Sequence, residues 1–396
     1  MQRHLNLLWQ SLCVTLLAFA LSYTLAYDIS SLSVLSSVEE TADVALSDIY
    51  NVVAERRAVS RVSDEVVLVG IDRCTRGEIA AVLEAVDWCE PKAVGLDIFF
   101  RHPSHEDATL LAALQNCRNL VLPTRVVYAE DCGQFVVSEE SCFDALIPDK
   151  TRGVVNLATD HVYQMVREFK VTFPLSDGTT LDNFVVTLTR CAAPEVYGRF
   201  AERCNEREII RYPSIEFETL MAEDVLDAEG FPTPEAEALL KGRVVLVGAV
   251  QDPADFHLTP TQPQMSGLRI HACALQTILS ESYIRRMPEW VGWLLAVLFC
   301  FLFSWLNMFI KQDARWNNIE ALGLRAVQMG LMYGFLVVGC WWFVRHDGYI
   351  DFSASLLMIG LSAVASDVWM GLCDIVRLVA CNYQQWKHKA KNAHEA

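Results

Sequence analysis

The sequence predicts an α/β domain that is held in a membrane by four α-helices, one before the domain and three after it. Two observations lead to this prediction. Four apolar segments are each about 20 residues long, which is the length that a helix needs to cross roughly 30 Å of hydrocarbon. Between the first two of them, apolar strands alternate with amphipathic helices, a pattern typical of a mainly parallel sheet sandwiched between helices on both faces.

The four apolar segments divide the 396-residue chain. They are residues 5–27, 289–310, 326–344 and 352–373. The first contains no charged side chain and is longer than the usual apolar core of a cleaved signal peptide, although Thr24, Leu25 and Ala26 offer a cleavage point for that alternative. The predicted organisation is a transmembrane helix in 1–27, a domain outside the cytoplasm in 28–288, three transmembrane helices in 289–373 and a short tail in 374–396.

Charge is spread unevenly along the chain. Residues 28–288 contain 41 acidic and 23 basic side chains, a formal net charge of −18. Such a field disfavours nucleic acid and anionic membrane surfaces as partners. Basic residues flank the apolar segments at Arg3, in 311–325 and in 377–391, and positively charged flanks tend to stay in the cytoplasm. We therefore expect a multi-pass protein of a bacterial inner membrane, with both termini cytoplasmic and 28–288 extracytoplasmic.

The apolar pattern predicts strand and helix units on either side of a less regular middle region. The predicted strands are 66–72, 93–100, 119–128 and 243–250. The predicted helices are 79–86, 107–116 and 267–284. Strands and helices in this order pair the strands in parallel through right-handed crossovers. Before them, 30–57 has apolar residues at helical spacing, which predicts a stalk or packing helix.

The middle region, 129–240, is polar and irregular, and we expect it to be an insertion that elaborates the sheet. Three short apolar runs in it predict strands. They are 154–157, 163–170 and 184–188.

Eight of the 13 cysteines fall in 28–288, an even number that permits disulfides in an oxidising compartment. Connectivity cannot be read from a sequence, but position along the predicted elements favours three pairs. They are Cys132 with Cys142, Cys191 with Cys204, and Cys89 with Cys117. The alternative is that these cysteines are free and buried.

Polar side chains follow the predicted strands at the edge where open parallel sheets bind ligands, beyond the carboxyl ends of the strands. The candidate ligand-binding residues are Asp72, Asp97, Asp252, Asp255, His257, Thr259 and His271. Together they predict a site for a polar small molecule or a cation. The alternative is that the short acidic side chains cap helices and turns.

Two further groups of residues are weaker candidates. His102 and His105, with nitrogen and oxygen atoms from the loop after residue 250, provide ligand types that suit zinc. Their spacing is not that of a known helical zinc motif, and Ser104 with Asp107 also fits a helix start, so we expect no metal and no cofactor. Asp367 lies in the last apolar segment, where a carboxylate faces a partner or water unless it stands close to the membrane boundary.

Four motifs together resemble a known family. They are VVLVGID at 66–72, PKAVGLDIFF at 91–100, GRVVLVG at 242–248 and MSGLRIHA at 265–272. Over roughly 30–290 the chain resembles the type 2 CHASE domain, an extracytoplasmic sensory module of bacterial receptors. The resemblance implies one transmembrane helix before the domain, three after it, and a homodimer. Family members usually continue into a cytoplasmic kinase or cyclase, whereas only 23 residues follow Cys373, so the resemblance implies a stand-alone form whose output lies in a separate protein.

Catalytic signatures are missing from the sequence: it has no phosphate-binding P-loop, dinucleotide-binding glycine loop, nucleophile elbow or zinc-protease motif. We therefore expect a binding protein and not an enzyme. The predicted function is a transmembrane sensor that detects a ligand or an envelope component and signals to a separate protein. The alternatives are an envelope scaffold that does not switch, and an exported hydrolase using Asp72, Asp97 and Asp255.

Overall fold

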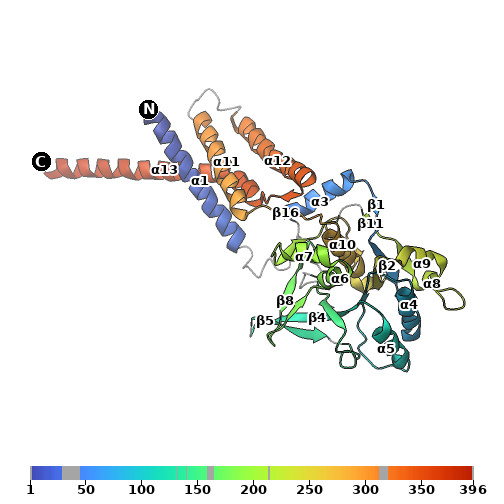
Figure 1. Cartoon of the computed structure of the whole chain (residues 1–396). Coiled ribbons are helices and arrows are strands. Elements are labelled where there is room, and N and C mark those ends of the chain that lie inside the picture. The colour runs from blue at the N-terminus through green and yellow to red at the C-terminus, as the bar shows by residue number, and fades with distance from the viewer. Residues whose placement is uncertain are drawn as a thin grey trace. The chain divides into compact units, whose positions relative to one another are not determined.

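The computed structural model describes residues 2–28, 45–131, 133–139, 141–157, 165–212, 215–311 and 320–394. The chain divides into two compact units, and many of their elements are labelled in Figure 1. The α/β unit spans Asp43–Arg285, and the helical unit combines Met1–Ala42 with Arg286–Ala396.

A central sheet and the helices packed on it make up most of the α/β unit. The sheet strands, in spatial order, are β12 (Thr219–Met221), β2 (Val66–Gly70), β13 (Val244–Gly248), β3 (Ala93–Asp97), β4 (Leu120–Ala129) and β5 (Gln134–Glu139), and β6 (Thr151–Val154) also pairs with β4. The helices are α3 (Leu46–Arg57), α4 (Arg76–Trp88), α5 (Asp107–Asn116), α6 (Phe184–Ala192), α7 (Pro194–Ala201), α8 (Ala222–Val225), α9 (Pro234–Leu240) and α10 (Gly267–Leu279).

Short strand pairs surround the central sheet. They are β1 (Arg61–Val62) with β11 (Ile215–Glu216), β7 (Glu168–Lys170) with β10 (Arg207–Ile209), β8 (Thr172–Pro174) with β9 (Thr180–Asp182), and β14 (Phe256–His257) with β15 (Met265–Ser266). All pairings in the central sheet are parallel except β4 with β5. The mixed α/β class is therefore confirmed. The predicted parallel pairing describes the central sheet, but it misses β5 and the three antiparallel pairs outside that sheet.

Each face of the central sheet is covered by helices, because successive side chains of a strand point to opposite faces. In β2, Val67 and Val69 pack with α4 and α5, whereas Val66 and Leu68 pack with α6 and α10. The strand β13 alternates in the same way between the two cores. Buried on both faces, these strands are apolar at every position, and this continuous apolar run is the signal that predicted them.

The predicted strand at 184–188 is wrong, because these residues form the first half of α6. The Asn183 side chain accepts a hydrogen bond from the backbone N–H of Val185 and so caps the helix start. Residues 184–189 are all buried, so the segment has no exposed face that would show a helical period. A β-branched run buried on all sides cannot be assigned to strand or helix from its periodicity.

The other predicted elements of the middle region and the stalk are found in part. The predicted strand at 154–157 overlaps β6 only at Val154, and residues 155–157 are outside any strand, whereas the described part of 163–170 contains β7. Of the predicted helix 30–57, residues 30–44 lie outside the described residues, and the rest contains α3. This helix is tied to the unit by Asp48, whose Oδ1 lies 2.8 Å from Arg167 Nε.

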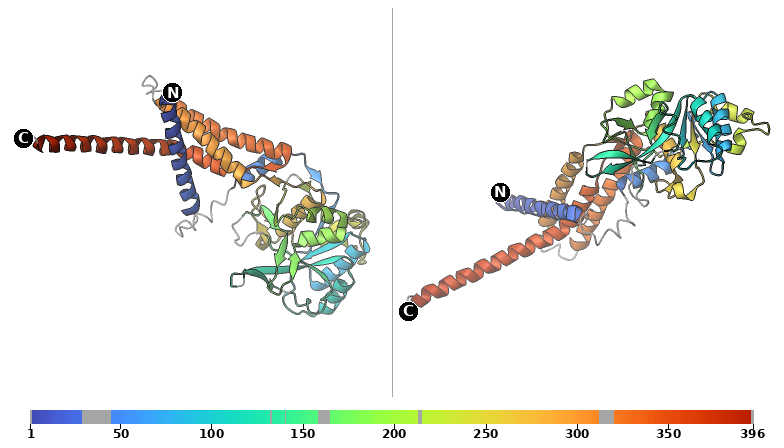
Figure 2. Two further views of the ribbon diagram at one scale, coloured as in Figure 1. Left: turned by 60° about the vertical axis from the view of Figure 1, so that its left-hand side comes forward. Right: turned by 90° about the horizontal axis from the view of Figure 1, so that it is seen from below.

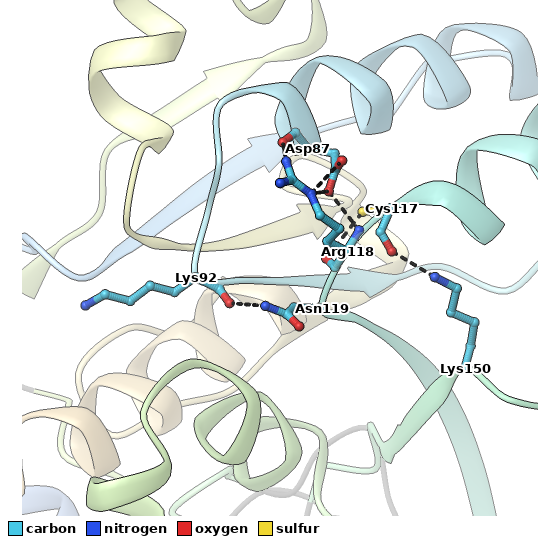
Figure 3. Close-up of polar contacts among 6 residues, drawn as sticks. All are labelled: Asp87, Lys92, Cys117, Arg118, Asn119 and Lys150. Atoms are coloured by element: carbon cyan, nitrogen blue, oxygen red, sulfur yellow. Dashed lines mark hydrogen bonds and ion pairs between the residues drawn. The ribbon is translucent and has the colours of Figure 1, made fainter.

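Polar contacts at the amino edge of the sheet fix the turn between α5 and β4 (Figure 3). The Asp87 carboxylate, near the end of α4, accepts hydrogen bonds from the backbone N–H and the guanidinium of Arg118. Asn119 adopts a left-handed φ of 48° and donates from Nδ2 to the Lys92 carbonyl at 3.0 Å. These contacts join the segments that lead into β3 and β4, so the two strands start in register.

Five of the six cysteines expected in disulfides are free thiols in the structure, namely Cys89, Cys117, Cys142, Cys191 and Cys204. Cys89 and Cys117 end α4 and α5 inside the same apolar core, where a thiol packs as a small apolar group. Burial raises the pKa of Cys89 to about 11 and that of Cys117 to about 12, so neither is a thiolate at neutral pH. Cys191 is half-buried on α6, whereas Cys204 is exposed after α7. The third expected pair includes Cys132, which lies outside the described residues.

The helical unit contains four helices that are long and apolar enough to cross a membrane. They are α1 (Gln2–Asp28), α11 (Glu289–Lys311), α12 (Glu320–His346) and α13 (Ser353–His394). The two-residue strands β16 (Arg285–Arg286) and β17 (Gly348–Tyr349) lie next to α11 and α12 in the sequence. The four predicted spans are thus matched by four candidate spans, although α13 continues through most of the predicted tail. At about 1.5 Å per residue its 42 residues extend for roughly 63 Å, and both views in Figure 2 show it running past the other three helices.

Packing in the helical unit combines apolar contacts with a few hydrogen bonds. Side chains of α1, α11 and α13 form its core, including Val14, Ala296 and Ala365. Between α11 and α13, Asn307 Nδ2 donates to Ser366 Oγ at 2.8 Å. Such interhelical hydrogen bonds are a common feature of helix packing in membranes.

Candidate functional site

The carboxyl ends of three parallel strands meet at one edge of the central sheet. Gly248, the last residue of β13, lies between Gly70 of β2 and Asp97 of β3 in the strand register. A Cβ atom at Gly248 would lie 2.9 Å from the Leu268 side chain and 3.2 Å from the Asp97 carbonyl. Glycine at this position therefore lets α10 approach the edge closely, which brings the candidate residues of α10 next to those of β3.

Four of the seven predicted site residues gather here, and we call Asp97, Asp255, His257 and His271 the carboxyl-edge cluster. His271 Nε2 lies 3.8 Å from Asp97 Oδ2, and His257 Nε2 lies 3.7 Å from Asp255 Oδ1. Asp255 Oδ2 also accepts a hydrogen bond from the backbone N–H of Gly267, the first residue of α10, at 3.0 Å. The antiparallel pairing of β14 with β15 holds the loop of Asp255 and His257 against the start of this helix.

Burial decides the charge state of the two innermost groups. The Asp97 side chain is 17% exposed and that of His271 is 5% exposed. Burial, reinforced by the negative charge of Asp255, raises the pKa of Asp97 to about 7, against the opposing effect of Arg125 and His257. Burial lowers the pKa of His271 to about 4. Between these two values both groups are neutral in the folded protein, so their close approach is not an ion pair.

The remaining contact between Asp97 and His271 is also too long for a direct hydrogen bond at 3.8 Å. Within the cluster, Asp97 and His271 are thus two buried groups that are both neutral between about pH 4 and 7. Asp97 becomes charged as the pH rises through this upper limit, and His271 becomes charged as the pH falls through the lower one. A change in its protonation, or a polar ligand that satisfies these groups, would alter the electrostatic balance where β3 meets α10.

The other three predicted residues make hydrogen bonds to the backbone of nearby loops and turns. Asp72 accepts hydrogen bonds from the backbone N–H groups of Val250 and Gln251, at 3.0 and 2.7 Å. Asp252 accepts from the backbone N–H of Ala254 at 2.9 Å and caps the short 3₁₀ helix Pro253–Asp255. Thr259 closes a turn by exchanging two hydrogen bonds with the backbone of Gln262.

The weaker candidates lie apart from the cluster. His102 contributes its backbone carbonyl to a hydrogen bond with Arg76, which also pairs with Asp107 at the start of α5. In the part of the chain that the structure describes, no three His, Cys, Asp or Glu side chains are placed to hold a metal ion, so His102 and His105 are not brought together with further ligands. Asp367 lies on an exposed face of α13 within the helical unit.

Two residues near the cluster were not predicted from the sequence. Arg125 on β4 is close enough to lower the pKa of Asp97, and its guanidinium lies 5.4 Å from the centre of the Phe99 ring. Phe184, the first residue of α6, places its ring 5.4 Å from the His271 ring, edge to face. The signal for Arg125 in the sequence is a charged residue inside the apolar run 119–128. Phe184 lies in a run that predicts a strand, and no pattern in the sequence links it to the site.

One comparison with known proteins identifies a family for this chain. The family model of the CHASE2 domain matches residues 14–306, which include the second half of α1, the whole α/β unit and most of α11. Neither a curated protein nor a solved structure matches the chain. The family model covers well over half of the 396 residues, and the chain therefore belongs to the CHASE2 domain family.

Proposed function

We propose that the protein is a transmembrane sensor whose α/β unit detects a ligand or an envelope component and passes the change through its membrane helices to a separate protein. The sensory character of the CHASE2 family and the four candidate spans support this function. In the proposed arrangement the protein lies in a bacterial inner membrane as a homodimer, with both termini in the cytoplasm and the α/β unit outside it.

The observation that carries the proposal is the position of α10. The start of α10 contacts the carboxyl-edge cluster, because the backbone N–H of Gly267 donates to Asp255 and His271 on the same helix is a member of the cluster. Soon after the last residue of α10, Leu279, the chain enters α11 at Glu289, the first of the three C-terminal membrane helices. A change at the cluster that shifts α10 would therefore act on a segment continuous with a membrane span. A ligand produces such a shift only if it binds the two conformations with different affinity.

We also propose that the protein binds its ligand without catalysing a reaction. The hydrolase alternative requires Asp72, Asp97 and Asp255 to face one substrate at the carboxyl edge of the sheet. Asp72 is instead occupied by two backbone N–H groups, and a carboxylate that holds a turn is poorly placed to act on a substrate.

The test is to identify the proteins that copurify with the gently solubilised full-length chain and to quantify cross-links between them and residues 374–396. Three forms are compared: the wild type, Asp97→Asn, which alters the cluster, and Asp64→Asn, which replaces an exposed carboxylate of the same unit. We expect a cytoplasmic partner whose cross-links to the tail change in Asp97→Asn and stay at the wild-type level in Asp64→Asn.

A constant set of envelope proteins in fixed stoichiometry, identical in all three forms, would contradict the sensor function and favour the scaffold. Turnover of a substrate that disappears in Asp97→Asn would instead favour the hydrolase.

A further inference from the structure

A cavity of about 270 Å³ lies between α6, α7 and the segment that leads into β10, and we call it the α6–α7 cavity. This is close to the lower end of the roughly 300–1,000 Å³ range of small-molecule sites. Its walls include Val186, Tyr197 and Phe200, of which the first and last are 2% and 3% exposed. The cavity therefore offers buried apolar and aromatic contacts to a small ligand.

Carboxylates supply the polar part of the lining. Asp182, Glu206 and Glu208 all line the α6–α7 cavity. Asp182 pairs with Arg190 at 2.6 Å, and the buried Glu208 pairs with Arg203 at 2.7 Å. The three carboxylates carry one more charge than the two guanidinium groups of Arg190 and Arg203, so these five side chains have a net charge of −1. An apolar body with a single positive charge is the ligand chemistry that matches both features.

The wall of the cavity also contacts the segment that leads to the membrane helices. Phe200 stacks on Tyr283 with ring centres 6.0 Å apart, and the Arg203 guanidinium lies 4.0 Å from the centre of the same ring. Next to them on α7, Arg199 pairs with Glu281 at 2.6 Å. Glu281 has a left-handed φ of 51°, a conformation that an L-residue keeps only when its surroundings hold it. Residues 281–283 are followed by β16 and then by α11.

We propose that the α6–α7 cavity binds a small organic monocation with an apolar body, and that binding is relayed through Phe200 and Arg203 to residues 281–283. Glu208 lines the cavity and holds Arg203 in place over Tyr283, so a cation that competes for Glu208 loosens the contact with Tyr283. The ligand site stands on the cavity alone, whereas the relay rests on the proposed sensor function.

The first experiment measures binding to the solubilised full-length protein by titration calorimetry. The probe is 2-phenylethylamine, and the control is 3-phenylpropanoate, which has a similar body and the opposite charge. Cys204 provides a second readout because it lines the cavity and is exposed. Its alkylation by iodoacetamide is followed by peptide mass spectrometry, with the exposed Cys381 of α13 as the internal reference.

Variants at the rim test the location without disturbing the core. Ala201 lines the cavity from an exposed position, and Ala201→Phe is expected to weaken probe binding by about tenfold or more, since it fills the space. Glu206→Gln removes one exposed carboxylate and is expected to weaken binding about two- to fivefold. Glu202→Gln, an exposed residue that ends α7 outside the lining, is the matched control and should bind as the wild type does.

We expect saturable binding of the amine and not of the carboxylate, with slower alkylation of Cys204 and unchanged alkylation of Cys381. No saturable binding, or equal binding in Ala201→Phe, would overturn the ligand site, and the partner experiment above would still decide the sensor function. The relay predicts that the probe changes hydrogen exchange in residues 281–288, that Tyr283→Phe keeps this response, and that Tyr283→Leu loses it. Bound probe with unchanged exchange in the wild type would overturn the relay.

Discussion

Replacing Asp97 by Asn should make the stability of the α/β unit depend on pH in a range where the wild-type pair Asp97 and His271 contributes almost no dependence. The folded-state pKa of Asp97 is raised to about 7 from 3.8. The favourable contribution of Asp97 to the free energy of unfolding is therefore complete below pH 4 and is lost as the pH rises toward 7. The folded-state pKa of His271 is lowered to about 4 from 6.5, so its contribution is complete above pH 6.5 and is lost as the pH falls toward 4.

These two contributions have opposite slopes over the pH range that they share. Between pH 4 and 6.5 the folded state holds its proton on Asp97, whereas the unfolded state holds one on His271, so the pair takes up no net proton on unfolding. In Asp97→Asn only the His271 contribution remains. At 1.36 kcal/mol per pKa unit, stability relative to the wild type should fall by about 3 kcal/mol as the pH decreases across this range. The His271→Gln variant should show the opposite slope.

Equilibrium urea unfolding of the solubilised chain, at several values between about pH 4.5 and 6.5, measures this difference. Cys273 reports on the α/β unit because it is 7% exposed on α10. After equilibration, a short alkylation pulse at one fixed pH labels Cys273 only in unfolded molecules. Asp64→Asn serves as the control and should follow the wild type. Parallel profiles for the wild type and Asp97→Asn would refute the assignment of neutral groups to the carboxyl-edge cluster.

Three other substitutions have expected effects on stability. Gly95→Ala should cost about 1–3 kcal/mol by overpacking, because its Cβ would lie 2.8 Å from a ring atom of α6; urea unfolding measures the loss. Thr75→Ala should cost about 1 kcal/mol, because Thr75 accepts the hydrogen bond from the Glu78 N–H that caps α4, and Thr75→Ser should restore most of it in the same assay. Asn307→Val should weaken the helical unit by about 0.6 kcal/mol, through loss of the bond to Ser366, and unfolding in mixed micelles tests this. No measurable loss in any one of them would contradict the contact on which it rests.

The parts of the fold that the sequence predicted are those with a strong local pattern. The run VVLVG occurs at 66–70 and at 244–248, and both copies form parallel central strands buried on both faces. The spatial order of the strands had no such signal. It depends on contacts between distant segments, and the three-residue strand β12 is too short to show any period.

The candidate site was predicted in part for a similar reason. Asp97, Asp255, His257 and His271 follow strands or begin a helix, where the general geometry of parallel sheets brings side chains together. Whether such a carboxylate binds a turn, as Asp72 does, depends on which backbone N–H groups lie within reach. The α6–α7 cavity was not predicted, because its lining comes from several separate segments of the irregular middle region.

The position of β13 has a consequence for how the protein is made. In the sheet, β13 separates β2 from β3, although both precede it in the sequence by well over a hundred residues. During synthesis the edges of β2 and β3 that pair with β13 therefore stay unpaired, and can pair wrongly, until residue 248 has left the ribosome. The first candidate span, α1, is synthesised more than two hundred residues before that point. The sheet thus closes late, shortly before the last three helices emerge, and a chaperone that shields the early strands should raise the yield of folded protein.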